Sequence, residues 1–497
     1  MMRSVRTSSG HRRGDICRSF CRSICRSFGR GDGRSRRRWA FGLMAGFSLA
    51  VVGAGCGQQV EEVDLSFDSR PVGSLADVAG LAERDDLNVL FILIDTLRSD
   101  HLSAYGYERP TSPVLDYVAG TGLRFANHRA QSTWTKTSMA SLWTGLYPQR
   151  TDVLSHQDAV APAAEMPAEI FKENGWSTTG IWRNGWVAPN FGFNQGFDIY
   201  LTPRPRQAPS AMRTKPIAGR IDGTDIDGIY AATEFLRVNQ DRKFFLYVHL
   251  MDVHQYITVE ETALFGTTYL DAYDNSIRWE DQQVGEILAE LHRLDMAKDT
   301  LVFIVSDHGE AFGEHGTEGH ARDIHHEATN TPFIIGFPFR LDPGHIIEHA
   351  TQNVDVMPTL YDLVGIETDA PSDGKSRAGW LMGDYTPDFP DRDISHLDRS
   401  WGKKDTEPDT TIGLREGHYR LIHDVNKPDR DQLYDVRSDP GEFIDIAADE
   451  PSILNSLRNA AREYLEQEPA WEGGAPEIEL DEMSLRQLRA LGYAIED

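Results

Sequence analysis

The chain has 497 residues, of which 40% are hydrophobic, and its net charge is −27 at neutral pH. This length is enough to bury a large core and predicts one large domain with a smaller second one. The first 56 residues contain twelve arginines against two aspartates, so residues 57–497 together have a charge of −37. A body this acidic, with no stripe of basic residues, argues against nucleic acid as a partner.

The first 56 residues differ from the rest of the chain and are typical of an export signal. Seventeen uncharged residues, 39–55, follow the basic stretch and lead to Cys56. The sequence Gly-Ala-Gly-Cys at 53–56 resembles a bacterial lipobox. We therefore expect a lipoprotein leader at 1–56 and an exported protein of the cell envelope, held to the membrane by a lipid on Cys56. An uncleaved membrane anchor is the alternative.

All four cysteines of the chain lie within this leader. The exported body therefore has no disulfide, no thiolate metal site and no cysteine nucleophile.

The rest of the chain divides by composition. Residues 57–85 are polar and acidic, and we predict a tether there. Residues 86–368 alternate short apolar runs with amphipathic stretches such as 270–294, which is typical of an α/β domain with a mostly parallel sheet flanked by helices. The predicted strands of this sheet are 89–94, 177–182, 244–250, 301–305 and 333–335.

A change of composition near residue 370 indicates a second unit. We predict a small α+β subdomain at 369–466 that closes the edge of the sheet. Its strands lie within 411–423 and 432–435, and its helix is 451–465. Residues 467–497 are predicted to be a tail with a short helix.

Two of the predicted strands end in acidic residues. Asp95 follows the run 89–94, and Asp307 and His308 follow the run 301–305. Ligands of open α/β sheets bind beyond the carboxyl ends of the strands. Two carboxylates and an imidazole at that edge predict a metal site, whereas either aspartate alone is equally well explained as a helix cap.

Between these strands lies a threonine-rich entry to a short helix. Residues 139–143 are followed by Gly145, which predicts a helix that ends at the glycine. A helix N-terminus offers free N–H groups to a phosphate or sulfate oxygen. Thr135 is close to this N-terminus, but a threonine hydroxyl needs a metal to become a good nucleophile. Taken by itself, Thr135 fits a helix cap better than a nucleophile.

Several of these motifs together resemble the sulfatase family of the alkaline phosphatase superfamily. They are Asp-Thr-Leu-Arg-Ser-Asp-His at 95–101, Thr-Gly-Leu-Tyr-Pro at 144–148, Ser-Asp-His-Gly-Glu at 306–310 and Gly-Glu-His-Gly at 313–316. They follow the order of the family, and 415–435 resembles its C-terminal subdomain. The resemblance implies an alkaline-phosphatase/sulfatase-like fold and an ester hydrolase that depends on a divalent metal.

The resemblance also implies roles for individual residues. It implies that one metal ion is held by Asp95, Thr135, Asp307 and His308, with Thr135 bridging the metal and the substrate. His254 matches the family's histidine at the substrate or leaving group. His320 lies where the family places a lysine or histidine on the anion, and Lys136 would add a cation beside the nucleophile.

The departures from the family pattern affect the chemistry. Sulfatases oxidise a Cys or Ser in a Cys/Ser-x-Pro-x-Arg signature to formylglycine, but the matching positions here are Thr135, Thr137 and Met139. Oxidation of threonine gives a ketone and not the required aldehyde, so no formylglycine is expected. Thr96 replaces a second aspartate ligand. With His308 present, the expected ion (Ca²⁺, Mn²⁺ or Zn²⁺) shifts from Ca²⁺ towards Mn²⁺ or Zn²⁺.

In having a threonine at the position of the nucleophile, the chain resembles other branches of the superfamily: phosphodiesterases, phosphoethanolamine transferases and lipoteichoic acid synthases. We therefore expect a hydrolase of sulfate or phosphate/phosphonate esters that acts on a small molecule or glycan, with phosphorus esters slightly favoured. The alternatives are a phosphoryl-group transferase of the envelope and an inactive protein that binds sulfated or phosphorylated glycans. A two-metal phosphatase would need a second ion at Asp252, His254 and His320. The sequence names neither the substrate nor the oligomeric state.

Overall fold

The computed structural model describes residues 68–205, 212–213, 223–381, 392–403, 406–480 and 485. The predicted leader at 1–56, most of the predicted tether and most of the predicted tail helix lie outside these residues. Residues 61–497 form one compact unit. Within the described ranges, no helix is both long enough and apolar enough to cross a membrane.

The main feature of this unit is a mixed eight-stranded sheet with the strand order β12-β2-β11-β8-β1-β6-β3-β4. The five strands from β8 to β4 are parallel, and β11 runs antiparallel to both of its neighbours. All five strands predicted from the sequence are present, so the predicted fold class is confirmed. The bounds are β1 Asn88–Ile94, β2 Leu123–Arg129, β3 Ser177–Ile181, β4 Ile199–Leu201, β6 Phe244–Leu250, β8 Thr300–Val305, β11 Phe333–Gly336 and β12 His345–Gln352.

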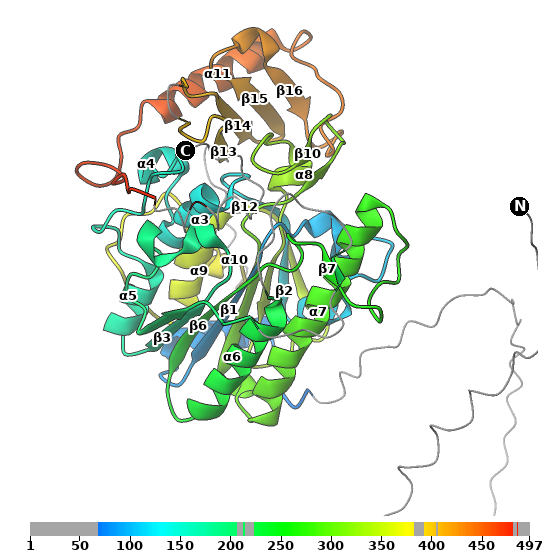
Figure 1. Cartoon of the computed structure of the whole chain (residues 1–497), viewed down its shortest axis with the longest axis vertical. Helices are drawn as coiled ribbons and strands as arrows, with labels where there is room; N and C mark the ends of the chain where they lie inside the picture. Colours follow the sequence, from blue (N-terminus) through cyan, green and yellow to red (C-terminus); the bar gives the residue numbers. More distant parts are fainter. Residues whose placement is uncertain are drawn as a thin grey trace, which may run out of the picture. The chain divides into compact units, whose positions relative to one another are not determined.

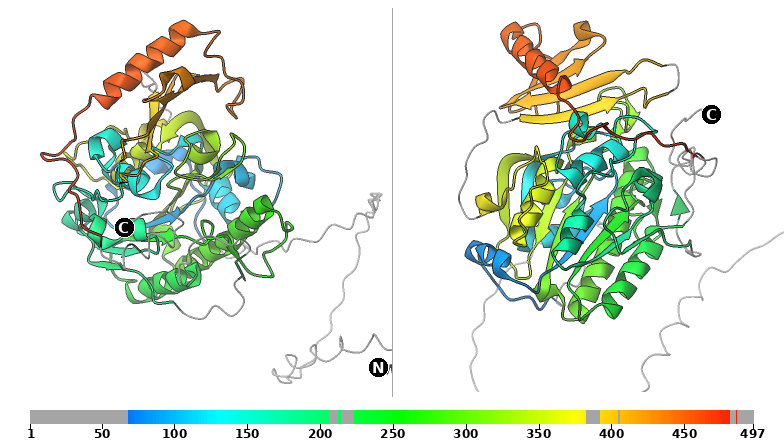
Figure 2. Two further views of the ribbon diagram at one scale, coloured as in Figure 1. Left: turned by 45° about the horizontal axis from the view of Figure 1, so that its top comes forward. Right: turned by 90° about the vertical axis from the view of Figure 1, so that its left-hand side faces the viewer.

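Helices cover both faces of the sheet (Figures 1 and 2). All seven residues of β1 are buried, and its side chains alternate between the two faces. Val89, Phe91 and Leu93 pack in one apolar core with α3 (Thr135–Thr144), α5 (Pro167–Glu173) and α9 (Val356–Leu363). The alternate residues pack in a second core with α2 (Pro113–Thr121), α6 (Asp225–Val238) and α7 (Tyr269–Arg293). Burial on both faces explains why the strand is a continuous apolar run.

The C-terminal part forms a separate antiparallel sheet of four strands, covered on one side by α11 (Figure 1). This is the subdomain that the sequence predicted to close the edge of the main sheet. Its first strand bonds to the segment after β2, through Ser395 Oγ to Ala130 O and His396 N to Gln131 O, each at 2.8 Å. The subdomain therefore lies beyond the carboxyl ends of the strands. Its elements are β13 Arg392–Asp398, β14 Thr410–Glu416, β15 Tyr419–Asp424, β16 Gln432–Asp435 and α11 Pro451–Leu465.

The remaining helices and strands are short. They are α1 Leu75–Ala79, α4 Pro148–Thr151, α8 His326–Thr329, α10 Ala378–Leu381, β5 Met212–Arg213, β7 Ile257–Thr258, β9 Ala311–Phe312 and β10 Glu318–Gly319.

Candidate active site

Polar residues meet at the carboxyl ends of the four central parallel strands. Asp95 directly follows β1, Asp307 is two residues beyond β8, and His249 is the last residue but one of β6. Asn184 lies three residues beyond β3, and Thr135 is the first residue of α3. Since parallel strands end at one edge of the sheet, the fold brings these five side chains together from distant parts of the sequence.

Asp95, Asp307 and His308 form a cluster in which one ligand atom of each lies within 4.8 Å of the others. All three residues are fully buried. Asp95 Oδ1 and Asp307 Oδ2 have no hydrogen-bond partner in the described part of the chain. Leaving a buried carboxylate oxygen unpaired is costly. The cluster is therefore a group of side chains that could bind a metal ion.

The pKa values of the two carboxyl groups differ in direction. Burial would raise the pKa of Asp95, but the nearby His254, His249 and His308 outweigh burial and lower it below its usual range. The pKa of Asp307 is raised, first by burial and then by the negative charge of Asp95. Two carboxylates this close repel each other unless a cation lies between them.

The ring of His308 is oriented for a ligand role. Its Nδ1 donates to the carbonyl oxygen of Gly309 at 2.9 Å. The Nε2 lone pair then faces the site, 3.2 Å from Thr135 Oγ1 and 3.4 Å from Asp307 Oδ2. A backbone contact at one ring nitrogen that leaves the other free is the usual arrangement of a metal-binding histidine.

Two residues that sequence reasoning missed orient Asp95. His249 Nε2 donates to Asp95 Oδ2 at 3.0 Å, and its Nδ1 accepts from the hydroxyl of Tyr247 at 2.7 Å. Asn184 Nδ2 donates to the same Oδ2 at 2.6 Å. These bonds occupy Oδ2 and leave Oδ1 free. The sequence does contain a signal for both residues. His249 is a polar residue within the apolar run of β6, and Asn184 is a polar residue just after the apolar run of β3.

Thr135 does not cap its helix. The N-cap position belongs to Trp134, and the Oγ1 of Thr135 contacts His308 Nε2 at 3.2 Å and Asn184 Nδ2 at 3.3 Å. The helix ends where it was predicted to end, because Gly145 adopts the left-handed conformation with φ 69°. The cap alternative for Thr135 is therefore wrong, and its hydroxyl lies in the site.

The side chain of Lys136 contacts residues outside the cluster of Asp95, Asp307 and His308. Its Nζ donates to the carbonyl oxygen of Asp158 at 2.7 Å and lies 4.3 Å from the ring centroid of Phe191, with Trp134 and Trp186 also around it. Burial lowers the pKa of this amine well below its usual value. Within the described residues, no contact of its amine with Thr135 or the carboxylates is found, so the role of Lys136 as a cation beside the nucleophile stays a prediction.

His254 and His320 lie beside the cluster. The ring of His320 is 4.8 Å from those of both His254 and His308. His254 Nδ1 accepts from the Gln255 amide at 3.0 Å, so its Nε2 bears the hydrogen, and this atom is buried without a partner. Burial lowers the pKa of His254 to about 4.

Glu310 is a further residue that the sequence analysis did not assign. Its Oε2 lies 2.6 Å from His320 Nδ1, and its Oε1 accepts from Tyr256 at 2.7 Å. Burial works against charge on His320, but the contact with Glu310 outweighs it and raises the pKa of His320. The site thus presents one imidazole with a free N–H and one that favours the charged form.

The structure does not bring Asp252 together with His254 and His320. Asp252 Oδ1 lies 2.7 Å from Arg183 Nη1, and its Oδ2 accepts from Trp279 Nε1 at 2.8 Å. In the described ranges, the metal-compatible group that contains Asp252 is completed by Asp225 and Glu280. The second ion of the two-metal alternative therefore lacks its ligand set.

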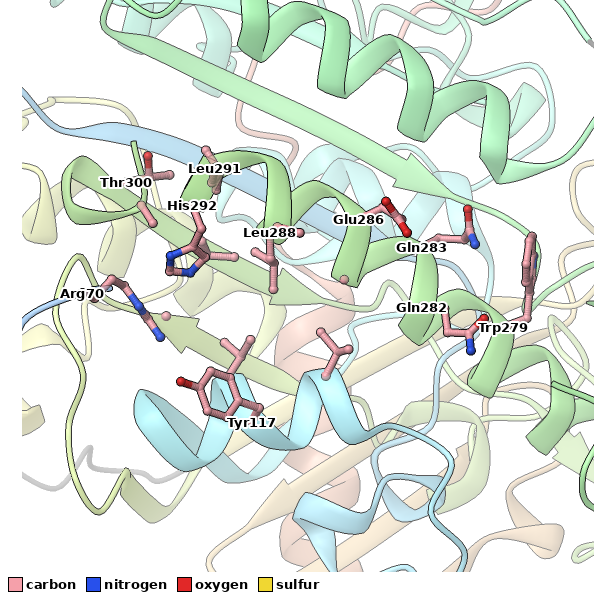
Figure 3. Close-up of a pocket in the computed structure, with 17 residues that line it drawn as sticks. Arg70, Tyr117, Trp279, Gln282, Gln283, Glu286, Leu288, Leu291, His292 and Thr300 are labelled. Atoms are coloured by element: carbon pink, nitrogen blue, oxygen red, sulfur yellow. The ribbon is translucent and has the colours of Figure 1, made fainter. Parts of the chain in front are cut away.

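A cavity of about 570 Å³ lies away from these residues, between α2 and α7 (Figure 3). Tyr117, Leu288 and His292 line it, and none of the site residues does. This cavity is therefore separate from the cluster of polar residues at the strand ends.

Comparisons with known proteins show the family to which this chain belongs. A family model described as Sulfatase matches residues 87–366, and one described as N-sulphoglucosamine sulphohydrolase, C-terminal, matches residues 313–468. The N-acetylgalactosamine-6-O-sulfatase of Bacteroides thetaiotaomicron is 24% identical over 485 residues, covering 74% of this chain and 91% of the relative. The Delta 4,5-hexuronate-2-O-sulfatase of that organism is 23% identical over 419 residues, covering 73% and 85%.

The fold is also similar to that of solved structures. The phosphonate monoester hydrolase of Agrobacterium radiobacter superposes with a TM-score of 0.62 at 19% identity, covering 79% of this chain and 100% of that one. At this level of identity the likeness shows the fold.

Proposed function

The chain belongs to the sulfatase family of ester hydrolases, and from this premise we propose that it cleaves an anionic ester with Thr135 as the nucleophile. The observation that supports this most directly is the position of Thr135 Oγ1. It lies 3.2 Å from His308 Nε2 and 3.3 Å from Asn184 Nδ2, beside the buried carboxylates. A hydroxyl held at a helix N-terminus next to such a cluster has the surroundings that an alcohol nucleophile needs.

A divalent metal fits this cluster. The unpaired Asp95 Oδ1 and Asp307 Oδ2 and the inward lone pair of His308 are the donor set, with Thr135 Oγ1 beside them. When bound, the ion supplies Lewis-acid chemistry that favours the alkoxide of Thr135. Two carboxylates and one imidazole suit Mn²⁺ or Zn²⁺ better than Ca²⁺, which prefers six to eight oxygens.

The protein's own groups account for the bond changes. The oxygen of Thr135 forms a bond to phosphorus or sulfur while the bond to the alcohol oxygen breaks in line with it. Thr135 loses one proton and the leaving oxygen gains one. The free Nε2–H of His254 donates a hydrogen bond to the leaving oxygen, and the charged form of His320 stabilises the anion. Water then breaks the ester on Thr135 and restores the hydroxyl.

Threonine favours phosphorus esters over sulfate esters. The aldehyde hydrate of formylglycine can expel sulfate by itself, whereas a sulfate ester of threonine has no such route. A phosphothreonine needs only attack by water at phosphorus. We therefore assign phosphate or phosphonate esters as the preferred substrates, with a sulfate ester as the second candidate because the family's named relatives are sulfatases.

The test is turnover of aryl phosphate, phosphonate and sulfate esters by the full chain with Mn²⁺, Zn²⁺ or Ca²⁺. Thr135→Ala should lower kcat on phosphorus esters by about a thousandfold or more, as loss of a nucleophile does. Thr135→Ser should retain activity because it keeps the hydroxyl. Thr137→Ala is the matched control, since Thr137 Oγ1 donates to Val153 O and lies outside the site. Undiminished turnover by Thr135→Ala would rule out this nucleophile.

A further inference from the structure

The cavity of about 570 Å³ between α2 and α7 is elongated along α7. Figure 3 shows Arg70, Tyr117 and His292 at one end of it and Trp279 and Gln282 at the other. Trp279 and His292 belong to the same helix and are thirteen positions apart, which corresponds to about 20 Å along the helix axis. We call this elongated cavity the α7 groove.

The walls of the α7 groove are mostly apolar. Val114 and Val118 of α2 lie on one side of it, and Leu288 and Ala289 of α7 lie on the other. Leu288 and Ala289 are partly exposed, although both belong to the wall of a cavity. A concave apolar surface of this size is typical of a site that binds a ligand or a chain segment.

One buried polar group in the wall indicates what kind of occupant fits. Gln283 lines the α7 groove and is 7% exposed, and its side-chain amide forms no hydrogen bond with any described residue. A buried amide without a partner is costly. An extended peptide offers such an amide both N–H donors and C=O acceptors, which a purely apolar molecule does not. The groove therefore suits a peptide with apolar side chains.

The described part of the chain begins at one end of this groove. The side chain of Asp68, the first described residue, is 1% exposed. Its Oδ2 accepts from Arg70 Nη2 at 2.6 Å and from the hydroxyl of Tyr117 at 2.8 Å, and its Oδ1 lies 3.7 Å from His292 Nε2. All three partners line the groove. The Cα atom of Phe67 is about 3.8 Å from that of Asp68, so the preceding chain starts at the groove.

The six residues before Asp68 match the groove in length and in polarity. Their sequence is Glu-Val-Asp-Leu-Ser-Phe at 62–67. An extended chain rises about 3.3 Å per residue, so six residues span about 20 Å. Side chains alternate between the two sides of an extended segment, so Val63, Leu65 and Phe67 share one side and the polar residues share the other.

We propose that residues 62–67 bind in the α7 groove in an extended conformation. The apolar side chains of Val63, Leu65 and Phe67 pack against α2 and α7, and the backbone pairs with the amide of Gln283. This inference is independent of the proposed function. Five residues, 57–61, then remain between Cys56 and the groove, so a lipid on Cys56 holds the catalytic body within about 20 Å of its attachment point.

The test is hydrogen exchange in the full chain, followed by mass spectrometry of the peptide that contains residues 62–67. Its amides should exchange at least about tenfold more slowly than those of a free peptide with the same sequence. Ala289→Trp fills the groove without changing the segment and should remove this protection. Leu65→Ser combined with Phe67→Ser changes the segment without changing the groove and should remove it as well.

Val72→Ser is the matched control for these variants. Val72 belongs to the same part of the chain, is 62% exposed and does not line the groove. The control should keep the protection of wild type. All variants should cleave aryl esters with kcat/KM within about twofold of wild type, because the groove is separate from the residues at the strand ends.

A second measurement detects the groove itself. The double serine variant should bind the apolar dye anilinonaphthalene sulfonate more strongly than wild type does, because its groove is no longer filled. Exchange of 62–67 at the rate of the free peptide in wild type would overturn the inference. Full protection in Ala289→Trp would also overturn it, because the segment would then bind elsewhere. A lipid released from wild type together with an unprotected segment would assign the groove to that lipid instead.

Discussion

At the scale of single residues, Thr96, which follows Asp95, has a backbone conformation that a threonine side chain disfavours. Thr96 has φ 61°, in the left-handed region that β-branched residues rarely adopt. Its N–H donates to Asp307 Oδ1 at 3.3 Å, and its Oγ1 donates to Asp95 O at 2.6 Å. Thr96 thus links the ends of β1 and β8. Such strain, about 1–3 kcal/mol, is often found at functional sites.

Replacing Thr96 by asparagine should relieve this strain, because asparagine tolerates the left-handed region. We expect Thr96→Asn to raise the free energy of unfolding by about 0.5–1 kcal/mol. Thr96→Val keeps the branched side chain and loses the hydroxyl, so it should be less stable than wild type. Urea unfolding of both variants in EDTA checks this. A destabilised Thr96→Asn would show that the hydroxyl bond outweighs the backbone strain.

At the scale of elements, the hairpin formed by β9 and β10 joins the active site to the C-terminal part. It contains His315, whose Nδ1 lies 2.9 Å from Glu327 Oε1 of α8 and whose Nε2 donates to Glu442 O at 2.8 Å. The rings of His325 and Phe443 stack on its two sides, with centroids at 4.0 and 5.0 Å. The hairpin is therefore anchored to two other segments through one imidazole.

The stability supplied by His315 should depend on pH. Burial lowers its pKa, but Glu327 outweighs burial and raises it to about 9 from 6.5. A raised pKa stabilises the fold below the unfolded value, and this stability is lost as the pH rises through about 9. His315→Gln should lower the free energy of unfolding by about 1 kcal/mol at pH 6, and by less at pH 10.

The measurement is urea unfolding at pH 6, 8 and 10. His418→Gln serves as the control, because His418 has no hydrogen bond to a carboxylate within the described ranges. An equal loss at all three pH values would mean that His315 acts by packing alone.

At the scale of the whole molecule, two clusters of buried acidic residues in the described part of the chain differ in their counter-charges. Arg183 pairs with Asp225 and Asp252 at 2.6 and 2.7 Å, and burial raises the pKa of the adjoining Glu280 well above its usual value. Asp95 and Asp307 have no arginine or lysine beside them within the described ranges. The first group has a guanidinium as its counter-charge, so we expect a bound cation to contribute to the stability of the fold at the second.

Metal should therefore stabilise the full chain. After treatment with EDTA, Mn²⁺ or Zn²⁺ at about 100 times its Kd should add about 2.7 kcal/mol and raise Tm by several degrees. Asp307→Asn should abolish this rise. Without metal, the same variant should be more stable than wild type, because one of two facing carboxylates has been removed. Scanning calorimetry measures both effects. A metal response that persists in Asp307→Asn would place the ion elsewhere.

Much of this protein follows from local patterns in the sequence. Apolar runs that are buried on both faces specify the strands of the main sheet, as for Asn88–Ile94, and Gly145 specifies the end of α3. The acids that follow two such runs indicated Asp95, Asp307 and His308, because a parallel sheet gathers its strand ends at one edge. The order of the motifs indicated the family, which the comparisons confirmed.

Only the tertiary structure decided which side chains complete the site. Asn184, His249 and Glu310 acquire their roles from partners elsewhere in the chain, and the bond from Asn184 to Asp95 spans 89 residues. Lys136 is next to Thr135 in sequence, yet the start of the helix directs the two side chains to different surroundings. Local propensity specifies an element, whereas packing between distant elements determines what each side chain meets.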